Sequence, residues 1–108
     1  MSISRQNLSI VIVTFKSEDV IHQCIKSIDD QIRIIVIENS NNEKFKEELE
    51  KEYKNVKCYL ALKNLGMGPG NNLGITKCDT NYILILNPDV ILEGSTIENM
   101  LLASNKIS

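Results

Sequence analysis

A short stretch late in the sequence limits the fold most strongly. Tyr82 to Leu86 is a continuous apolar run of strand-forming residues, and Asn87-Pro88-Asp89 follows it directly. Pro88 cannot donate a backbone hydrogen bond and disfavours helical angles at Asn87, so we predict a buried strand that stops abruptly. Asp89 then lies at the carboxyl end of a strand, where open parallel sheets bind ligands. On spacing alone, a cap of the following turn explains Asp89 equally well.

Three further apolar runs precede this strand, and segments with helical spacing separate them. The expected strands are residues 8–13, 32–37, 56–62 and 82–86. The expected helices are about 18–29 (capped by Ser17), 43–53 and 69–77, and residues 94–96 open a last one. This alternation predicts an α/β fold, a Rossmann-like three-layer parallel sheet with helices on both faces. Right-handed crossovers favour the strand order 3-2-1-4, which puts Thr14, Glu38 and Asp89 along one rim.

Length and composition narrow the class of protein. The chain has 108 residues, which suits a single domain, and its formal net charge of −2 gives no footprint for nucleic acid or an anionic membrane. Its three cysteines form no Cys-x-x-Cys pair, which favours reduced thiols. No run approaches the roughly 18 apolar residues of a transmembrane segment, and no signal peptide is expected. We therefore expect a cytoplasmic protein.

A glycine-rich loop precedes the third expected helix. Gly66, Gly68 and Gly70 are spaced by two, so they match neither Gly-x-Gly-x-x-Gly nor a P-loop. Glycines let a backbone approach a ligand closely, and the helix start after them favours an anion. A strand-to-helix turn that needs positive φ is the alternative, for which one or two glycines would suffice. Three glycines followed by Asn71 and Asn72 favour a binding loop.

Two acids on the predicted rim suit different ligands. Mg(II) or Mn(II) takes few protein carboxylates and fills its shell with water and substrate phosphates, so Asp89 alone could serve such a metal. A metal there would neutralise a departing diphosphate. Glu38 could accept hydrogen bonds from a base or a ribose, although a solvated loop acid is an equal interpretation.

Four segments together resemble a known family. They are Ile10-Val11-Ile12-Val13-Thr14-Phe15-Lys16, Ile35-Val36-Ile37-Glu38-Asn39-Ser40, the loop from Asn64 to Ile75, and Leu86-Asn87-Pro88-Asp89. In this order they resemble the nucleotide-sugar-binding half of a family 2 glycosyltransferase with the GT-A fold, in its rhamnosyltransferase-like branch. The loop matches the branch's Asn-x-Gly-(five residues)-Asn-x-Gly pattern, and Asn87-Pro88-Asp89 resembles its form of the Asp-x-Asp motif. Glu38 stands where the family usually has Asp, and Lys16 where it usually has Asn.

The resemblance implies transfer of a sugar, with inversion, from a nucleoside-diphosphate sugar to a hydroxyl of a carbohydrate or lipid-linked acceptor. This chain would supply donor binding only, and the acceptor half with its general base would lie outside it. Asp89 is the implied ligand of Mg(II) or Mn(II), and no residue here is implied as catalytic. The implied donor-binding residues are Thr14, Phe15, Glu38, Asn64, Gly66, Gly70, Asn71, Asn72, Asn87 and Asp89.

Two other classes of function fit the sequence. One is a non-catalytic nucleotide-binding or regulatory module, which would bind nucleotide without transfer. The other is an interaction domain whose sheet edge or exposed face pairs with another chain, for example as a homodimer. One fold hosts many functions, so the fold does not separate these classes.

Overall fold

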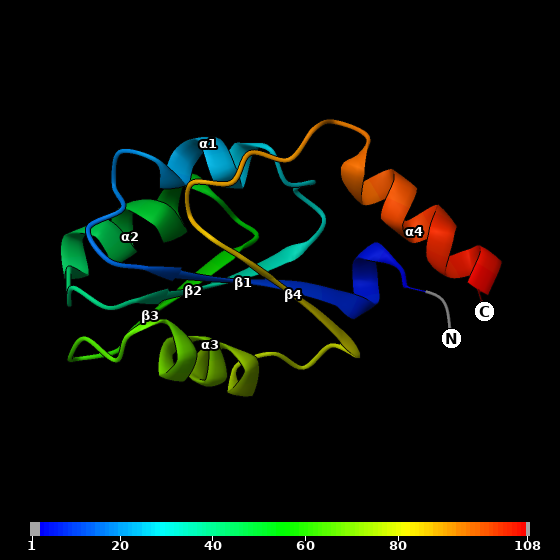
Figure 1. Cartoon of the computed structure of the whole chain (residues 1–108). Coiled ribbons are helices and arrows are strands. Elements are labelled where there is room, and N and C mark those ends of the chain that lie inside the picture. Colours follow the sequence, from blue (N-terminus) through cyan, green and yellow to red (C-terminus); the bar gives the residue numbers. More distant parts are fainter. Residues whose placement is uncertain (1–2, 108) are drawn as a thin grey trace.

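The computed structural model of the chain describes residues 3–107 and contains one four-stranded parallel sheet (Figure 1). Its strands are β1 (Leu8–Thr14), β2 (Arg33–Glu38), β3 (Val56–Leu60) and β4 (Tyr82–Leu86). They lie in the order β3-β2-β1-β4, and every neighbouring pair is parallel. The predicted order is therefore confirmed, with β3 and β4 at the two edges of the sheet. The prediction that residues 82–86 form a buried strand is wrong, because β4 has a single neighbouring strand and its side chains are only partly buried, with Ile85 42% exposed.

Helices cover both faces of this sheet, as expected from the alternating pattern. The elements are η1 (Arg5–Asn7), α1 (Ile21–Lys26), α2 (Glu43–Glu52), α3 (Met67–Thr76) and α4 (Thr96–Ile107). In Figure 1, α1 and α2 lie on one side of the sheet and α3 lies on the other. The three-layer architecture is therefore confirmed, with a single helix covering the second face.

Alternating side chains of the two central strands form two separate cores. On one face, Ile10 and Ile12 of β1 pack in a buried cluster that includes Ile25 of α1 and Leu49 of α2. On the other face, Val11 and Val13 pack with Ile35 and Ile37, and Leu73 of α3 covers them. Every residue of β1 is buried, because β1 has a strand on either side and helices above and below.

The first helix is shorter than the sequence predicts. Helix α1 begins at Ile21, and its N-cap is Val20 rather than Ser17. The Ser17 hydroxyl instead accepts a hydrogen bond from the backbone N–H of Phe15 at 3.2 Å. The carbonyl of Ser17 accepts the N–H groups of Val20 and Ile21, so residues 17–20 form a turn before the helix. The predicted cap is wrong because Ser17 stabilises the end of β1 instead.

The boundaries around the glycine loop also differ from expectation. Strand β3 ends at Leu60, and Leu62 has a left-handed φ of 68° that no strand residue adopts. Helix α3 begins at Met67, two residues earlier than predicted, because Gly66 (φ 77°) turns the chain directly into the helix. None of the helices within residues 3–107 is long and apolar enough to cross a membrane.

Candidate functional site

The strand register brings the carboxyl ends of three strands together. Thr14 at the end of β1 pairs with Glu38 at the end of β2, and Ile12 pairs with Leu86 at the end of β4. The Asn87-Pro88-Asp89 turn that follows β4 therefore starts beside the last residues of β1. Residues from three strands thus share one rim, which is the place where open parallel sheets carry ligand sites.

Glu38 is buried in this rim, with no exposed surface. Its Oε1 accepts hydrogen bonds from the hydroxyls of Ser40 (2.7 Å) and Thr14 (3.3 Å). Its Oε2 accepts the backbone N–H groups of Ser40 (3.1 Å) and Asn42 (2.9 Å). Both carboxylate oxygens are thus bound by the chain itself. Glu38 holds the loop that follows β2, and Asn42 in turn caps α2 by accepting the N–H of Phe45 at 3.0 Å.

Asn39 also lies at this site, although it is not among the donor-binding residues predicted from the sequence. It is 3% exposed, and its backbone N–H donates to the carbonyl of Thr14 at 2.8 Å. Its side-chain Nδ2 donates to the carbonyl of Gly66 (3.4 Å), and its Oδ1 accepts from the N–H of Leu65 (3.5 Å). Asn39 therefore ties the end of β1 to the glycine loop. The sequence feature that could have identified Asn39 is an amide side chain directly after a buried strand.

The glycines of the loop have different physical reasons to be glycine. Gly66 adopts a left-handed φ of 77°, and its N–H donates to Oδ1 of Asn64 at 3.0 Å. Gly70 is buried, and a Cβ there would lie 2.9 Å from Cγ1 of Val13 and 3.4 Å from Nδ2 of Asn39. Gly68 faces open space. Backbone conformation explains Gly66 and packing explains Gly70, without reference to a ligand.

The two asparagines at the start of α3 differ in their surroundings. Asn72 is exposed, whereas Asn71 is partly buried. Oδ1 of Asn71 is buried, and it is the one buried side-chain polar atom of the described residues that lacks a hydrogen-bond partner. Buried acceptors are nearly always paired in folded proteins, so this oxygen requires a donor from water or from a ligand.

Phe15 and Lys16 form the exposed border of the rim. Phe15 follows the buried Thr14 directly, yet its side chain is 50% exposed. The ammonium of Lys16 lies 5.4 Å from the centre of the Phe15 ring, within the range of a cation–π interaction. An exposed aromatic ring at the end of a central strand offers a flat surface on which a base can stack.

A hollow of about 790 Å³ opens beside Lys16, between the loops that follow β1, β2 and β3. Three of the residues that line it, Lys16, Asn41 and Leu62, have left-handed φ values of 53°, 55° and 68°. These are all the non-glycine residues with positive φ in the described part of the chain. Unfavourable backbone conformations of this kind gather at binding and catalytic sites.

The turn after β4 rests on α1. The backbone N–H of Val90 donates to the carbonyl of Asn87 at 3.1 Å, and the Cys24 thiol donates to the same carbonyl at 3.8 Å. Burial, together with the nearby negative charge of Asp89, raises the pKa of Cys24 to about 11. The side chains of Asn87 and Asp89 are both exposed at the rim.

The predicted metal ligand, Asp89, is a single exposed carboxylate. Within residues 3–107, no three His, Cys, Asp or Glu side chains are grouped so that they could hold a metal together. Asp89 forms no ion pair with any described residue. This arrangement fits a Mg(II) or Mn(II) ion that is bound through one carboxylate and the phosphates of a substrate, and it does not fit a zinc site.

Comparison with known proteins gives a family match and a fold match. A sequence model of the family described as "Glycosyl transferase family 2" matches residues 9–106. The structure of S. aureus TarS residues 1–349 is similar with a TM-score of 0.79 and 16% identity, over 93% of this chain and 32% of that one. A second S. aureus TarS structure gives a TM-score of 0.76 and 14% identity, over 93% and 20%. No curated protein sequence matches the chain.

Proposed function

The chain belongs to glycosyl transferase family 2, and on that premise we propose that it binds the nucleoside-diphosphate sugar donor of a glycosyltransferase. Its fold is GT-A-like, with the strand order 3-2-1-4 and a match to the N-terminal part of TarS. The chain spans about a third of the length of one TarS chain and about a fifth of the other. Because it matches only part of those proteins, the reaction that it takes part in is also a proposal. That reaction transfers the sugar, with inversion, to a hydroxyl of a carbohydrate or lipid-linked acceptor.

The observation that carries this proposal is the link through Asn39. Its hydrogen bonds fix the end of β1 and the glycine loop relative to each other, at the rim where the turn carrying Asp89 also begins. Phe15 offers its exposed ring to the nucleobase, with Lys16 beside it. The donor's ribose and diphosphate then extend along the rim towards Asp89.

In this proposal, Glu38 does not contact the base or the ribose directly, but holds the loop that does. Its two oxygens already accept four hydrogen bonds from Thr14, Ser40 and Asn42, and its side chain is fully buried. A nucleoside would therefore meet the loop that Glu38 holds, rather than a free carboxylate. The orphan Oδ1 of Asn71 provides an unused acceptor near the start of α3 for a donor group of the ligand or for a bound water.

A divalent cation bound at Asp89 would supply electrostatic stabilisation of the diphosphate as it leaves. The residues of this chain hold the donor's leaving group in place and orient the anomeric carbon towards an acceptor. Inverting transfer also needs a carboxylate base, and we assign that role to no residue here. The rhamnosyltransferase-like branch is proposed on the loop from Asn64 to Ile75 and on Asn87-Pro88-Asp89 alone. A cytoplasmic location is proposed from the three free thiols.

Calorimetric titration of the chain with UDP, dTDP and GDP, with and without Mn(II), tests the donor site. We expect one nucleotide to bind in the presence of the metal and more weakly in its absence. Asp89→Asn should abolish the metal dependence, because it removes the only proposed carboxylate ligand. Glu93→Gln is the matched control, since it neutralises another exposed acid in the same connection between β4 and α4.

The outcomes separate the proposed function from its alternatives. Metal-dependent binding that Asp89→Asn loses and Glu93→Gln keeps supports the donor site. Nucleotide binding that is unaffected by either substitution indicates a nucleotide-binding module with another site. If a folded, monodisperse sample binds none of the three nucleotides, the donor proposal is wrong and an interaction domain takes its place.

A further inference from the structure

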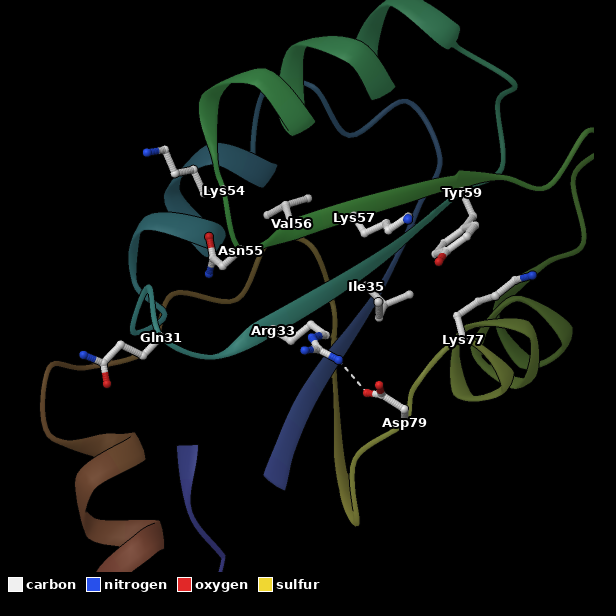
Figure 2. A pocket seen from close by; sticks show the side chains of 10 residues that line it. All are labelled: Gln31, Arg33, Ile35, Lys54, Asn55, Val56, Lys57, Tyr59, Lys77 and Asp79. Carbon is white, nitrogen blue, oxygen red and sulfur yellow. Dashed lines mark hydrogen bonds and ion pairs between the residues drawn. The ribbon is translucent and has the colours of Figure 1, made fainter. Parts of the chain in front are cut away.

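A basic groove of about 610 Å³ lies on the face of the sheet that carries α3 (Figure 2). It is lined by Arg33 of β2, Lys57 and Tyr59 of β3, Lys54 before β3, and Lys77 and Asp79 after α3. Figure 2 shows the side chains of Arg33, Lys57, Tyr59, Lys77 and Asp79 around an open space beside Ile35, with Lys54 at the outer end of the groove. The volume falls in the range of small-molecule sites, roughly 300–1,000 Å³.

Helix α3 lies over β1 and β2 and leaves the neighbouring part of the sheet uncovered. Gly70 and Gly74 seat the helix directly on β1, where their missing side chains leave room for Val11 and Val13. Side chains on alternate residues of β3 share the face of their β2 partners, and Lys57 pairs with Ile35. Because α3 lies over β1 and β2, the Lys57 side of the same face stays open to solvent.

The groove has a strong positive charge in a chain that is acidic overall. Arg33, Lys54, Lys57 and Lys77 face a single carboxylate, Asp79, which leaves a local net charge of +3, compared with −2 for the whole chain. Asp79 pairs with Arg33. Among residues 3–107, no carboxylate lies within ion-pair distance of any of the three lysines.

Tyr59 brings two of these lysines together. The ammonium of Lys77 lies 4.9 Å from the centre of the Tyr59 ring, and that of Lys57 lies 6.0 Å from it. Each ammonium is attracted by the ring, which offsets part of the repulsion between two like charges on neighbouring elements. Lysines that are scattered over a protein surface are not expected to gather around one aromatic ring in this way. Here Lys57 of β3 and Lys77 after α3 converge on one ring, and Lys54 lines the outer end of the same groove.

We propose that this groove binds a ligand that carries two or more linked phosphate groups. Arginine binds both carboxylates and phosphates in a planar, bidentate way, and Arg33 is already paired with Asp79. The free cations are all lysines, whose ammonium groups act as point charges and bind phosphate oxygens from many directions. Linked phosphates would place several negative charges beside Lys57 and Lys77, the two lysines that Tyr59 brings together.

The groove is separate from the proposed donor site. The groove begins at Arg33, five residues before Glu38 ends β2, so its far end lies roughly 16 Å from the rim at about 3.3 Å per residue. Its near end, at Tyr59, is level with Ile37, and the groove shares no lining residue with the hollow beside Lys16. Phosphate binding in the groove needs neither Asp89 nor a metal ion. The two proposals therefore stand or fail independently.

The test is a titration of ¹⁵N-labelled chain with sodium tripolyphosphate, followed by amide chemical shifts, at low salt and with EDTA present. EDTA removes metal-dependent binding at Asp89 from the measurement. We expect saturable shifts at the groove residues and weaker binding as salt is added. Lys57→Glu combined with Lys77→Glu should raise the Kd about tenfold or more, because two attractions become two repulsions.

Lys44→Glu combined with Lys51→Glu is the matched control, since both lysines are exposed on α2 and the net charge changes equally. We expect this control to weaken binding much less than the groove variant at low salt, and by less than about twofold at 0.15 M salt, where charges more than about 8 Å apart are largely screened. The dispersion of the amide spectrum shows whether each variant is folded.

Four results would overturn the proposal, the last of them through its assignment to phosphate. The first is the absence of saturable binding, and the second is equal weakening by the groove and control variants. The third is a set of shifts confined to the rim around Asp89 and the glycine loop. A hexaglutamate peptide that binds the groove as tightly as tripolyphosphate would also overturn the assignment to phosphate.

Discussion

Gly74 on α3 faces Val11 at the centre of β1 so closely that a methyl group on Gly74 would overlap Cγ1 of Val11. A Cβ there would also lie 3.3 Å from Cγ1 of Ile37. Because Val11 and Ile37 are fixed inside the second core, neither side chain can move away cheaply. The contact between this helix and the sheet therefore depends on the absence of a side chain.

We expect Gly74→Ala to destabilise the chain by about 1–3 kcal/mol, the usual effect of overpacking a core. Gly68→Ala is the matched control on the same helix, because a Cβ at Gly68 meets nothing within 4 Å. Because Gly68 lies in the first turn of α3, alanine there should raise the free energy of unfolding by at most about 0.5–1 kcal/mol, the gain found in a helix interior. Urea unfolding followed by circular dichroism gives both values, and equal midpoints for the two variants would contradict the close packing.

Replacing the Glu38 carboxylate should lower stability. In Glu38→Gln, an amide NH₂ at the position of Oε2 would face the backbone N–H donors of Ser40 and Asn42, which cannot accept. At the position of Oε1 it would require the hydroxyls of Thr14 and Ser40 to turn and accept, and the bonds from the backbone N–H groups would lose their charged acceptor. We expect a loss of about 1–3 kcal/mol in the free energy of unfolding. Glu48→Gln on the exposed side of α2 should change it by less than about 0.5 kcal/mol. A Glu38→Gln chain as stable as the original would show that these bonds are unimportant.

The exposed ring of Phe15 gives a prediction that separates binding from folding and rests on the proposed donor site. Phe15→Ala should weaken nucleotide binding by about 1–3 kcal/mol, the value of base–aromatic stacking. Its stability should change little, because the ring is half exposed. Phe15→Tyr keeps the ring and should bind like the original chain in the same calorimetric titration. Equal affinities for the Ala and Tyr variants would place the base elsewhere.

Two buried thiols predict a loss of stability at high pH. Burial, together with the nearby charges of Asp89 for Cys24 and of Glu38 and Glu50 for Cys58, raises their pKa values to about 11 and 12, from an ordinary 9.0. The unfolded chain therefore loses these protons first. The stability that the neutral thiols contribute is complete below pH 9 and falls as the pH rises through the window up to the folded values.

Urea midpoints measured at pH 8, 9 and 10 test this prediction. The midpoint should fall above pH 9, and Cys58→Ala should make the fall shallower, whatever its effect on stability at pH 8. Both thiols should also resist alkylation at pH 8 until the chain is unfolded, because they are buried and protonated. A midpoint that falls as steeply in Cys58→Ala as in the original chain would assign the effect to other groups.

The layers and the strand order follow from local patterns and were predictable for that reason. The sequence alternates continuous apolar runs with segments of helical spacing, and Pro88 ends one of the runs. This pattern is enough to predict a parallel sheet, and no knowledge of the distances between the layers is needed. Helix α1 was overestimated because the Ser17 hydroxyl bonds back to Phe15, a choice between two local hydrogen bonds that residue types alone do not decide.

The candidate site was predictable in its position and less so in its internal contacts. Strand ends and Asn87-Pro88-Asp89 place residues on one rim, and the register follows from the topology. The saturation of Glu38 depends on how residues 39–42 fold back, and the roles of Gly70 and Asn39 depend on the distance between α3 and the sheet. Such tertiary distances leave no signature in the spacing of a single sequence.

Leu62 has a practical consequence for anyone who alters this chain. A leucine in the left-handed region is destabilised by roughly 1–2 kcal/mol relative to one with ordinary backbone angles. The Leu62 side chain is 77% exposed, so its packing offsets little of this destabilisation. Laboratory evolution that selects for heat resistance alone should therefore replace Leu62 with glycine early. Selection that also demands ligand binding should retain a side chain at this border of the hollow. Comparing the two lineages would show whether the position is conserved for stability or for recognition.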